Sequence, residues 1–455
     1  DHGDEQSYAE IKNGKLVARF NSHGVLTFKN NKGETLLKEN WRRRKDEPSM
    51  SLEIEGREMK PVEGDNYRAT LRFKANEGEK IYGMGQYQHN FLNLKGCSLE
   101  LAQRNSQASV PFFISNQGYG FLWNNPAIGS VNFAKNGTEW VAKSTKQMDY
   151  WIIAGDSPAE IQQRYADVTG KVPMMPDYAM GLWQSKLRYR TQEEVLEVAR
   201  KYKELGLPLD VIVIDFFHWT QQGDYKFDPE YWPDPEKMIE ELNAMDIEVM
   251  VSFWPSVDYR SENFAEMMEK GYLVRTEEGV RVTMQFFGQE VFLDPTNPEA
   301  QKFVWNKVKG NYWDKGVKMF WLDIAEPEYT GYDFGNYRYY LGSDLEVGNI
   351  YPAMYSKTFY EGMKEEGLEN PINLVRCAWA GSQKYGTLVW SGDIDCTFNS
   401  LQRQIKAGLS MGLAGIPWVT TDIGGFQGAN IHDEDFKKLL IRWFQFACFS
   451  PVMRM

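Results

Sequence analysis

Short stretches in which apolar and polar residues alternate fill the first third of the chain. Residues 67–74 (YRATLRFK) alternate over eight positions, which is the period of a strand with one buried face. Similar runs cover residues 16–20, 50–54 and 110–114, and turn sequences such as Asn-Gly separate them. Short strands joined by such turns are typical of antiparallel sheets. We therefore predict an antiparallel β-sandwich over residues 1–175.

Beyond the proline-rich segment 172–177 (VPMMPD), apolar strand candidates alternate with helical segments. Repeated strand–helix units indicate a parallel sheet, and the first strand lacks the glycine-rich fingerprint of a nucleotide-binding fold. We therefore predict an α/β fold, a (β/α)8 TIM barrel, over residues 176–455. Its seven strand candidates are residues 180–183, 211–215, 249–254, 318–323, 373–377, 388–390 and 417–421.

Three of the intervening helices carry start signals. A capping box at Thr191 and Glu194 should open the first, with Val195, Val198, Tyr202 and Leu205 on its buried face. Asp and Asn followed by Pro, at 234–235 and 297–298, should open the other two.

A TIM barrel has eight strands, and the seven candidates leave one place open. The chain ends a few residues after a helical stretch at 436–449, and parallel sheets rarely leave an edge uncovered. We expect the eighth strand and the rest of the barrel to be missing from this chain and to lie beyond Met455.

Net charge and amino-acid composition exclude some classes of function. The 455 residues carry a net charge of −12 at pH 7, which argues against a nucleic-acid partner. Apolar runs are too short to span a membrane. Four cysteines and five histidines without metal-ligand spacing suggest neither a metal nor another cofactor. Aromatic residues make up 14% of the chain, which fits either a large core or a cleft that stacks sugar rings.

Compartment and assembly stay open at this stage. The chain starts at Asp1 without a recognisable leader, either because a signal peptide was removed or because the sequence is trimmed. This slightly favours a periplasmic or secreted protein over a cytoplasmic one. The sequence is also compatible with a homo-oligomer.

Carboxylates follow several of the predicted barrel strands, where TIM-barrel enzymes carry their active sites. Asp215, Asp323, Asp393 and Asp422 occupy such positions, with tryptophans beside them. Paired carboxylates lined by indole rings suit glycoside hydrolysis, which needs an acid and a second carboxylate at the anomeric carbon. Two alternatives remain: a sugar-binding protein without activity, and a metal-dependent barrel enzyme with Asp215, Asp323 and Asp422 as ligands.

Three segments in this order resemble glycoside hydrolase family 31: residues 320–328 (FWLDIAEPE), 390–393 (WSGD) and 421–426 (TDIGGF). The resemblance implies an exo-acting, retaining α-glycosidase with an oligosaccharide substrate and a covalent glycosyl-enzyme intermediate. It also implies C-terminal β-domains, which we expect to be missing from this chain and to lie beyond Met455. The roles that it implies are Asp323 as nucleophile, Asp393 as acid/base, Asp215 and Arg376 as hydrogen-bonding partners of the sugar, and Trp321, Trp390 and Asp422 as walls of its subsite.

The same resemblance offers a hint about the sugar. Family xylosidases carry a bulky aromatic residue two positions after the aspartate that ends strand two, and here Phe217 takes that place. Its ring would fill the volume that the C6 hydroxymethyl group of glucose needs, which favours terminal α-linked xylose. The alternative is that Phe217 packs in its loop while Trp254 or Trp219 lines the subsite. An α-glucosidase or an α-glucosyl transferase of the same family remains the competing activity.

Two glutamates close to Asp323 in sequence complete the candidates. Glu326 is expected to orient its neighbours, and Glu328 to face solvent or an entrance loop.

Overall fold

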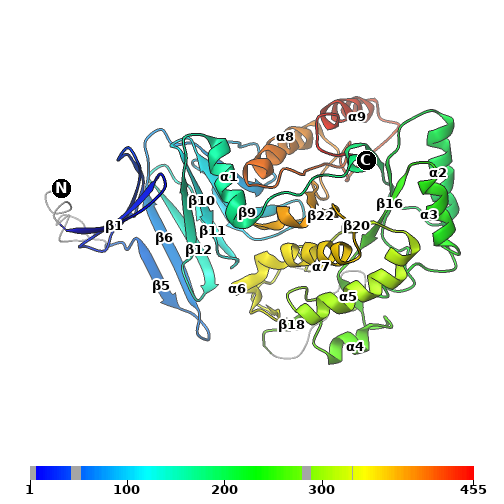
Figure 1. Cartoon of the computed structure of the whole chain (residues 1–455), viewed down its shortest axis with the longest axis horizontal. Coiled ribbons are helices and arrows are strands. Elements are labelled where there is room, and N and C mark those ends of the chain that lie inside the picture. Colours follow the sequence, from blue (N-terminus) through cyan, green and yellow to red (C-terminus); the bar gives the residue numbers. More distant parts are fainter. Residues whose placement is uncertain (1–6, 43–52, 279–287, 330–331) are drawn as a thin grey trace.

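The computed structural model describes residues 7–42, 53–278, 288–329 and 332–455. Figure 1 shows two parts side by side, an N-terminal part built of antiparallel sheets and a second part in which helices surround parallel strands. This is the predicted architecture, a β-sandwich followed by a TIM barrel. None of the helices in the described residues has the length and apolar character needed to cross a bilayer.

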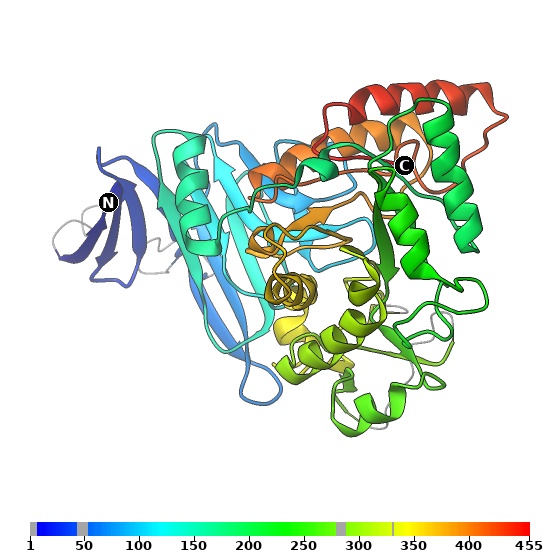
Figure 2. The ribbon, with the colours of Figure 1, turned by 45° about the vertical axis from the view of Figure 1, so that its right-hand side comes forward.

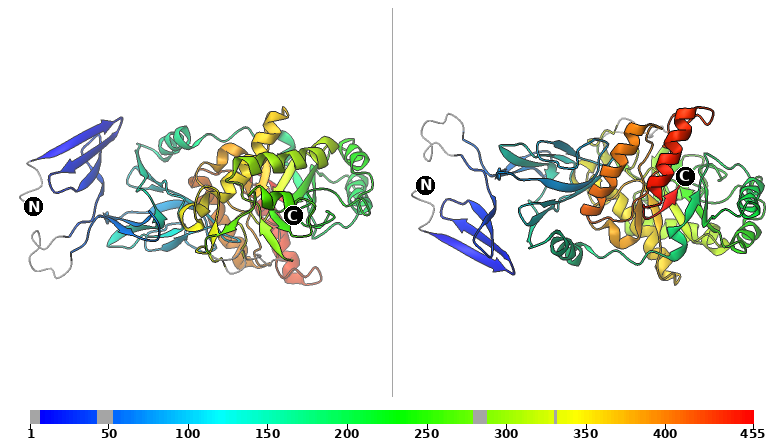
Figure 3. Two further views of the ribbon diagram at one scale, coloured as in Figure 1. Left: turned by 90° about the horizontal axis from the view of Figure 1, so that it is seen from below. Right: turned by 90° about the horizontal axis from the view of Figure 1, so that it is seen from above.

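Three antiparallel sheets form the N-terminal part. Two of them, ordered β13-β10-β9-β7 and β5-β6-β12-β11-β8, enclose a core of stacked and edge-on aromatic rings that includes Phe113, Phe121 and Trp140. The third, β1 to β4, stands at the outer end of the molecule (Figure 3). The strand expected at 50–54 lies largely outside the described residues. The strands are β1 (Tyr8–Asn13), β2 (Leu16–Asn21), β3 (Leu26–Asn30), β4 (Thr35–Lys38), β5 (Arg57–Pro61), β6 (Tyr67–Lys74), β7 (Ile81–Gln86), β8 (Ser98–Leu101), β9 (Ala108–Ser115), β10 (Tyr119–Trp123), β11 (Gly129–Asn132), β12 (Gly137–Thr145) and β13 (Tyr150–Ala154).

The barrel strands pair in parallel in the order β23-β22-β20-β16-β15-β14-β24. Their bounds are β14 (Leu182–Gln184), β15 (Val211–Ile214), β16 (Glu248–Phe253), β20 (Met319–Leu322), β22 (Asn373–Val375), β23 (Thr387–Val389) and β24 (Met453–Arg454). Two short antiparallel pairs lie in the connections, β17 (Ser256–Asp258) with β19 (Glu290–Phe292) and β18 (Arg275–Thr276) with β21 (Tyr337–Arg338).

The last two strands of the barrel differ from the sequence-based expectation. We expected the eighth strand beyond Met455, but β24 already occupies its place beside β14. The seventh candidate, 417–421, is reduced to a single parallel bridge between Val389 and Val419. The hydroxyl of Thr420 donates to the carbonyl of Val452 at 2.9 Å, which links this segment to the residues just before β24. The ring of strands therefore continues around to its first member.

Helices cover the outside of the barrel, with α2 and α3 packed together far from the sandwich (Figure 2). The Thr191 hydroxyl accepts a hydrogen bond from the backbone N–H of Glu194, as its capping box predicts. Leu205, expected on the buried face of α2, is exposed because the helix ends one residue earlier. The helices are α1 (Pro158–Thr169), α2 (Gln192–Glu204), α3 (Pro235–Asn243), α4 (Phe264–Glu269), α5 (Pro298–Asn311), α6 (Asp344–Val347), α7 (Tyr351–Glu365), α8 (Phe398–Leu413) and α9 (Glu434–Ala447), with short 3-10 turns η1 (Asp177–Met180), η2 (Trp313–Lys315), η3 (Gly348–Ile350) and η4 (Ser382–Tyr385).

The sandwich and the barrel share a buried interface. Ala108 and Val110 of β9 pack in one apolar cluster with barrel residues that include Val389 and Met411, and α8 packs against β7. The buried Gln103 amide donates to the carbonyl of Ala378 at 3.0 Å. One edge of the sandwich is thereby fixed to the loops that follow the barrel strands, where the candidate site lies.

Candidate active site

A cavity of about 250 Å³ opens where the barrel strands end. All but one of the residues predicted for the site line it. Its walls are formed by Leu187, Asp215, Phe216, Trp254, Trp321, Asp323, Ile324, Glu328, Arg376, Trp390, Asp393, Asp422 and Phe426. The exception among the predicted residues is Phe217.

Asp323 follows β20 directly and is held through both carboxylate oxygens. Oδ1 accepts hydrogen bonds from Arg376 Nη2 at 2.6 Å and from the backbone N–H of Ile324 at 2.8 Å. Oδ2 accepts from the indole N–H of Trp254 at 3.1 Å. Burial raises the pKa of Asp323, and the nearby Arg376 charge acts against that shift. The carboxylate is therefore fixed in one orientation facing the cavity.

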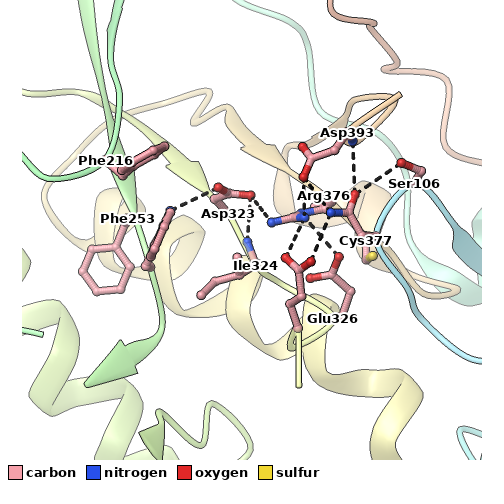
Figure 4. Close-up of polar contacts among 12 residues, drawn as sticks. Ser106, Phe216, Phe253, Asp323, Ile324, Glu326, Arg376, Cys377 and Asp393 are labelled. Atoms are coloured by element: carbon pink, nitrogen blue, oxygen red, sulfur yellow. Dashed lines mark hydrogen bonds and ion pairs between the residues drawn. The ribbon is translucent and has the colours of Figure 1, made fainter. Parts of the chain in front are cut away.

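Arg376 follows β22, is almost fully buried, and lies among four carboxyl groups (Figure 4). Besides Asp323, its guanidinium nitrogens lie 3.3 Å from Glu326 Oε1, 2.8 Å from Glu328 Oε2 and 3.6 Å from Asp393 Oδ2. Burial raises the pKa of Glu326 to about 8, which leaves this carboxyl group mainly neutral at pH 7. One cation thus holds the two predicted catalytic aspartates in a single cluster.

Asp393 lies on the loop after β23 and is the more accessible of the two, with 35% of its side chain exposed against 11% for Asp323. Gly392, just before it, has a φ of +70°, which turns the loop toward the cavity. The carboxylate accepts a hydrogen bond from the side-chain amide of Asn105 at 2.7 Å. Both carboxyl groups line the cavity, and that of Asp393 is the closer to solvent.

Asp215 and Asp422 complete the acidic wall. Burial raises the pKa of Asp215 to about 8, and it also raises the pKa of Asp422. Asp422 pairs with Arg454 of β24, whose guanidinium lies 4.5 Å from the ring centre of Trp321. The rings of Trp321 and Trp390 meet edge to face at 5.4 Å. These contacts build a rigid wall of indole rings and carboxyl groups.

Phe216, rather than Phe217, forms the phenyl wall of the cavity. Its ring lies 5.0 Å from that of Trp254, the second aromatic residue on this side. Phe217 has a φ of +59°, a left-handed conformation that turns its side chain into a neighbouring hollow. There it packs against Trp219, with Arg188 5.4 Å from its ring centre. The alternative in which Phe217 packs in its loop and Trp254 lines the site matches the structure.

The metal-dependent alternative required Asp215, Asp323 and Asp422 to act together as ligands. Across residues 7–42, 53–278, 288–329 and 332–455, no group of three or more His, Cys, Asp or Glu side chains is arranged to hold an ion. Asp323 and Asp422 are instead paired with arginines, Arg376 and Arg454.

Comparison with known proteins assigns the chain to a protein family. The model of the glycosyl hydrolases family 31 TIM-barrel domain matches residues 172–455, and that of the glycosyl hydrolase 31 N-terminal galactose mutarotase-like domain matches residues 2–132. The chain belongs to glycoside hydrolase family 31. Its relatives in that family include an uncharacterized family 31 glucosidase, ORF2, of Pseudescherichia vulneris, which is 57% identical over 98% of this chain and 86% of its own length. An α-xylosidase of Saccharolobus solfataricus is 34% identical over 97% of this chain.

Solved structures of family 31 proteins superpose closely on this member. A GH31 α-xylosidase from a soil metagenome, complexed with xylose, matches with a TM-score of 0.97 and 58% identity, over 100% of this chain and 68% of the other. A xylosidase from Aspergillus niger matches with a TM-score of 0.91 and 31% identity, over 99% and 68%. The chain spans 60% of the length of the S. solfataricus α-xylosidase.

The contacts that three polar residues make in this family 31 site were not predicted from the sequence. Glu328, expected to face solvent or an entrance loop, contacts Arg376, because the chain turns back after Asp323 at Ile324, whose φ is +44°. Asn105 comes from the sandwich, and nothing in the local sequence links it to Asp393. Arg454 was overlooked because its strand was not expected within the chain.

Proposed function

We propose that this family 31 chain forms the catalytic part of an exo-acting, retaining α-xylosidase, which removes terminal α-linked xylose from the non-reducing end of an oligosaccharide. The observation that carries the proposal is that Asp323 and Asp393 both lie against the buried guanidinium of Arg376 and both line one small cavity. Its volume of about 250 Å³ lies below the range of pockets for drug-sized ligands, which suits a single monosaccharide.

The contacts of Asp323 and Asp393 suit the two roles of a retaining mechanism. In the first step a carboxylate oxygen of Asp323 attacks the anomeric carbon, the glycosidic C–O bond breaks, and the proton on Asp393 passes to the departing oxygen. In the second step the Asp393 carboxylate takes a proton from water, whose oxygen attacks the same carbon and releases Asp323. The hydrogen bonds to both Asp323 oxygens orient the nucleophile, and the greater exposure of Asp393 suits contact with leaving group and water.

The preference for xylose rests on the aromatic side of the cavity. Glucose differs from xylose by one hydroxymethyl group, and we infer that the rings of Phe216 and Trp254, which line the cavity and contact each other, leave no space for it. The named α-xylosidases among the relatives and structural neighbours support the same substrate. Excluding a group of this size is worth about 1–3 kcal/mol, or roughly 10- to 200-fold in kcat/KM.

Aryl glycosides provide the test. We expect kcat/KM for 4-nitrophenyl α-xyloside to exceed that for the α-glucoside, and the first-formed xylose in an NMR time course to be the α-anomer. Phe216→Ala should raise glucoside activity and reduce the ratio at least about tenfold. Phe217→Ala is the matched control: its ring contacts that of Phe216 at 4.6 Å but lines the neighbouring hollow and not the cavity, so it should change the ratio less than Phe216→Ala does.

The competing activity is that of an α-glucosidase, which the name of the 57% identical relative favours. A wild-type preference for the glucoside would replace xylosidase by glucosidase while leaving the catalytic pair intact. A first product with inverted configuration would instead remove Asp323 as nucleophile. Binding of xylose without turnover of either substrate would favour the sugar-binding protein.

A further inference from the structure

Asn105 joins the sandwich to the proposed acid/base residue through two hydrogen bonds. Its side-chain N–H donates to Asp393 Oδ2 at 2.7 Å, and its side-chain carbonyl accepts from the backbone N–H of Asp393 at 3.1 Å. Only one orientation of the amide satisfies both partners, because the reversed amide would point its oxygen at the carboxylate. The same amide nitrogen, which carries two N–H groups, also donates to Glu328 Oε1 at 3.2 Å. The amide therefore fixes both the backbone and the side chain of Asp393.

The turn that carries Asn105 is itself held by the barrel. The backbones of Arg104 and Gln107 bond to each other across the turn. Arg104 stacks on the ring of Tyr332 at 4.7 Å, and the hydroxyl of Tyr332 accepts from the backbone N–H of Asn105 at 3.1 Å. The turn is thus ordered independently of the hydrogen bonds to Asp393.

A glycine allows the two loops to approach this closely. A Cβ added to Gly392 would lie 2.6 Å from the backbone nitrogen of Ser106, closer than atoms can pack. Figure 4 shows Ser106 beside the Asp393 loop, and the other residues that it labels come from the barrel. This close contact places the amide of Asn105 within bonding distance of the carboxylate.

From this geometry we propose that Asn105 is a positioning residue for Asp393 in acid/base catalysis. The inference rests on the proposed function, in which Asp393 protonates the leaving group. With Oδ2 held by the amide, Oδ1 is the oxygen left to carry the proton toward the glycosidic oxygen. Arg376, Asp323, Glu328 and Asp422 are the charged groups that interact with Asp393. Asn105 orients the Asp393 carboxyl group without adding a charge.

Leaving groups of different basicity test this role. Asn105→Ala should lower kcat/KM about 10- to 100-fold for an α-xylosyl disaccharide, whose alkoxide needs protonation, but less than about threefold for α-xylosyl fluoride. Asn105→Asp keeps the shape and the acceptor but replaces the donor with an oxygen, and should be at least as damaging on the disaccharide. Gln107→Ala is the control, because it disturbs the same turn through its contact with Ala102 and not through Asp393.

Asp393→Ala, measured in parallel, separates the two hypotheses. If its loss does not depend on the leaving group, the assignment of Asp393 as acid/base fails, and the role of Asn105 fails with it. If Asp393→Ala shows that dependence but Asn105→Ala loses both substrates equally, or neither, only the positioning role is overturned. A disaccharide-specific loss in Gln107→Ala as large as that in Asn105→Ala would also overturn it, since any distortion of the turn would then suffice. Full disaccharide activity in Asn105→Asp would show that the amide donor has no part.

Discussion

Glu326 offers a direct test of the charge balance around Arg376. Its carboxyl group is buried, and burial raises its pKa from 4.5 to about 8 even though Arg376 is 3.3 Å away. Between these two values the folded protein keeps a proton that the unfolded chain releases. Stability associated with Glu326 is therefore fully present below pH 4.5 and is lost as the pH rises toward 8. Glu326→Gln mimics the protonated form at every pH and should remove this loss.

The size of the effect follows from the shift. Each pH unit between the two pKa values costs the wild type about 1.4 kcal/mol, so the range from pH 5 to pH 8 amounts to about 4 kcal/mol. A 455-residue chain unfolds with an entropy of roughly 1 kcal/mol per kelvin, so this corresponds to about 4 °C in Tm. The Tm of Glu326→Gln relative to the wild type should therefore rise by up to about 4 °C over that range.

Thermal unfolding of both proteins at pH 5, 6, 7 and 8 measures this difference. The exposed Glu269→Gln on α4 serves as control for the substitution itself. A difference that stays flat, or that turns against the variant as the pH rises, would refute the reasoning. It would mean that Glu326 is ionised in the folded protein and that its ion pair with Arg376 outweighs the cost of burial.

Two further substitutions probe the pairs on which the site depends. Asp323→Asn should lower the turnover of every xyloside at least about 10³-fold, because no glycosyl-enzyme can form, while calorimetry still detects xylose binding. Retained turnover would show that another residue is the nucleophile. Arg454→Met should leave Asp422 as an unpaired buried carboxyl group and lower the free energy of unfolding by about 3 kcal/mol, which corresponds to a Tm decrease of about 3 °C. The control is Arg442→Met at an exposed position, which should change Tm little. An unchanged Tm in Arg454→Met would show that this pair contributes nothing to the fold.

The sequence predicted those parts of the site that depend on strand periodicity. Asp215 and Asp323 directly follow buried apolar strands, and that pattern alone places them at one end of the barrel. The sequence left two alternatives open for Phe217, because which of two adjacent phenyl rings faces the cavity depends on backbone conformation, and the φ of Phe217 is left-handed in the structure. No local pattern reveals a contact such as that between Asn105 and Asp393, which joins residues 288 positions apart.

The apolar cluster shared by β9 and the barrel has a consequence for how such chains can be recombined. Ala108 and Val110 fill space between barrel residues, and the turn just before them carries Asn105. A chimera that joined this barrel to the sandwich of another relative would have to match both the shape of that cluster and the turn that precedes it. Residues 103–110 are thus part of the sandwich in sequence, but several of their contacts are with the barrel. Exchange of whole domains between relatives should succeed only when this segment travels with the barrel that it was selected to fit.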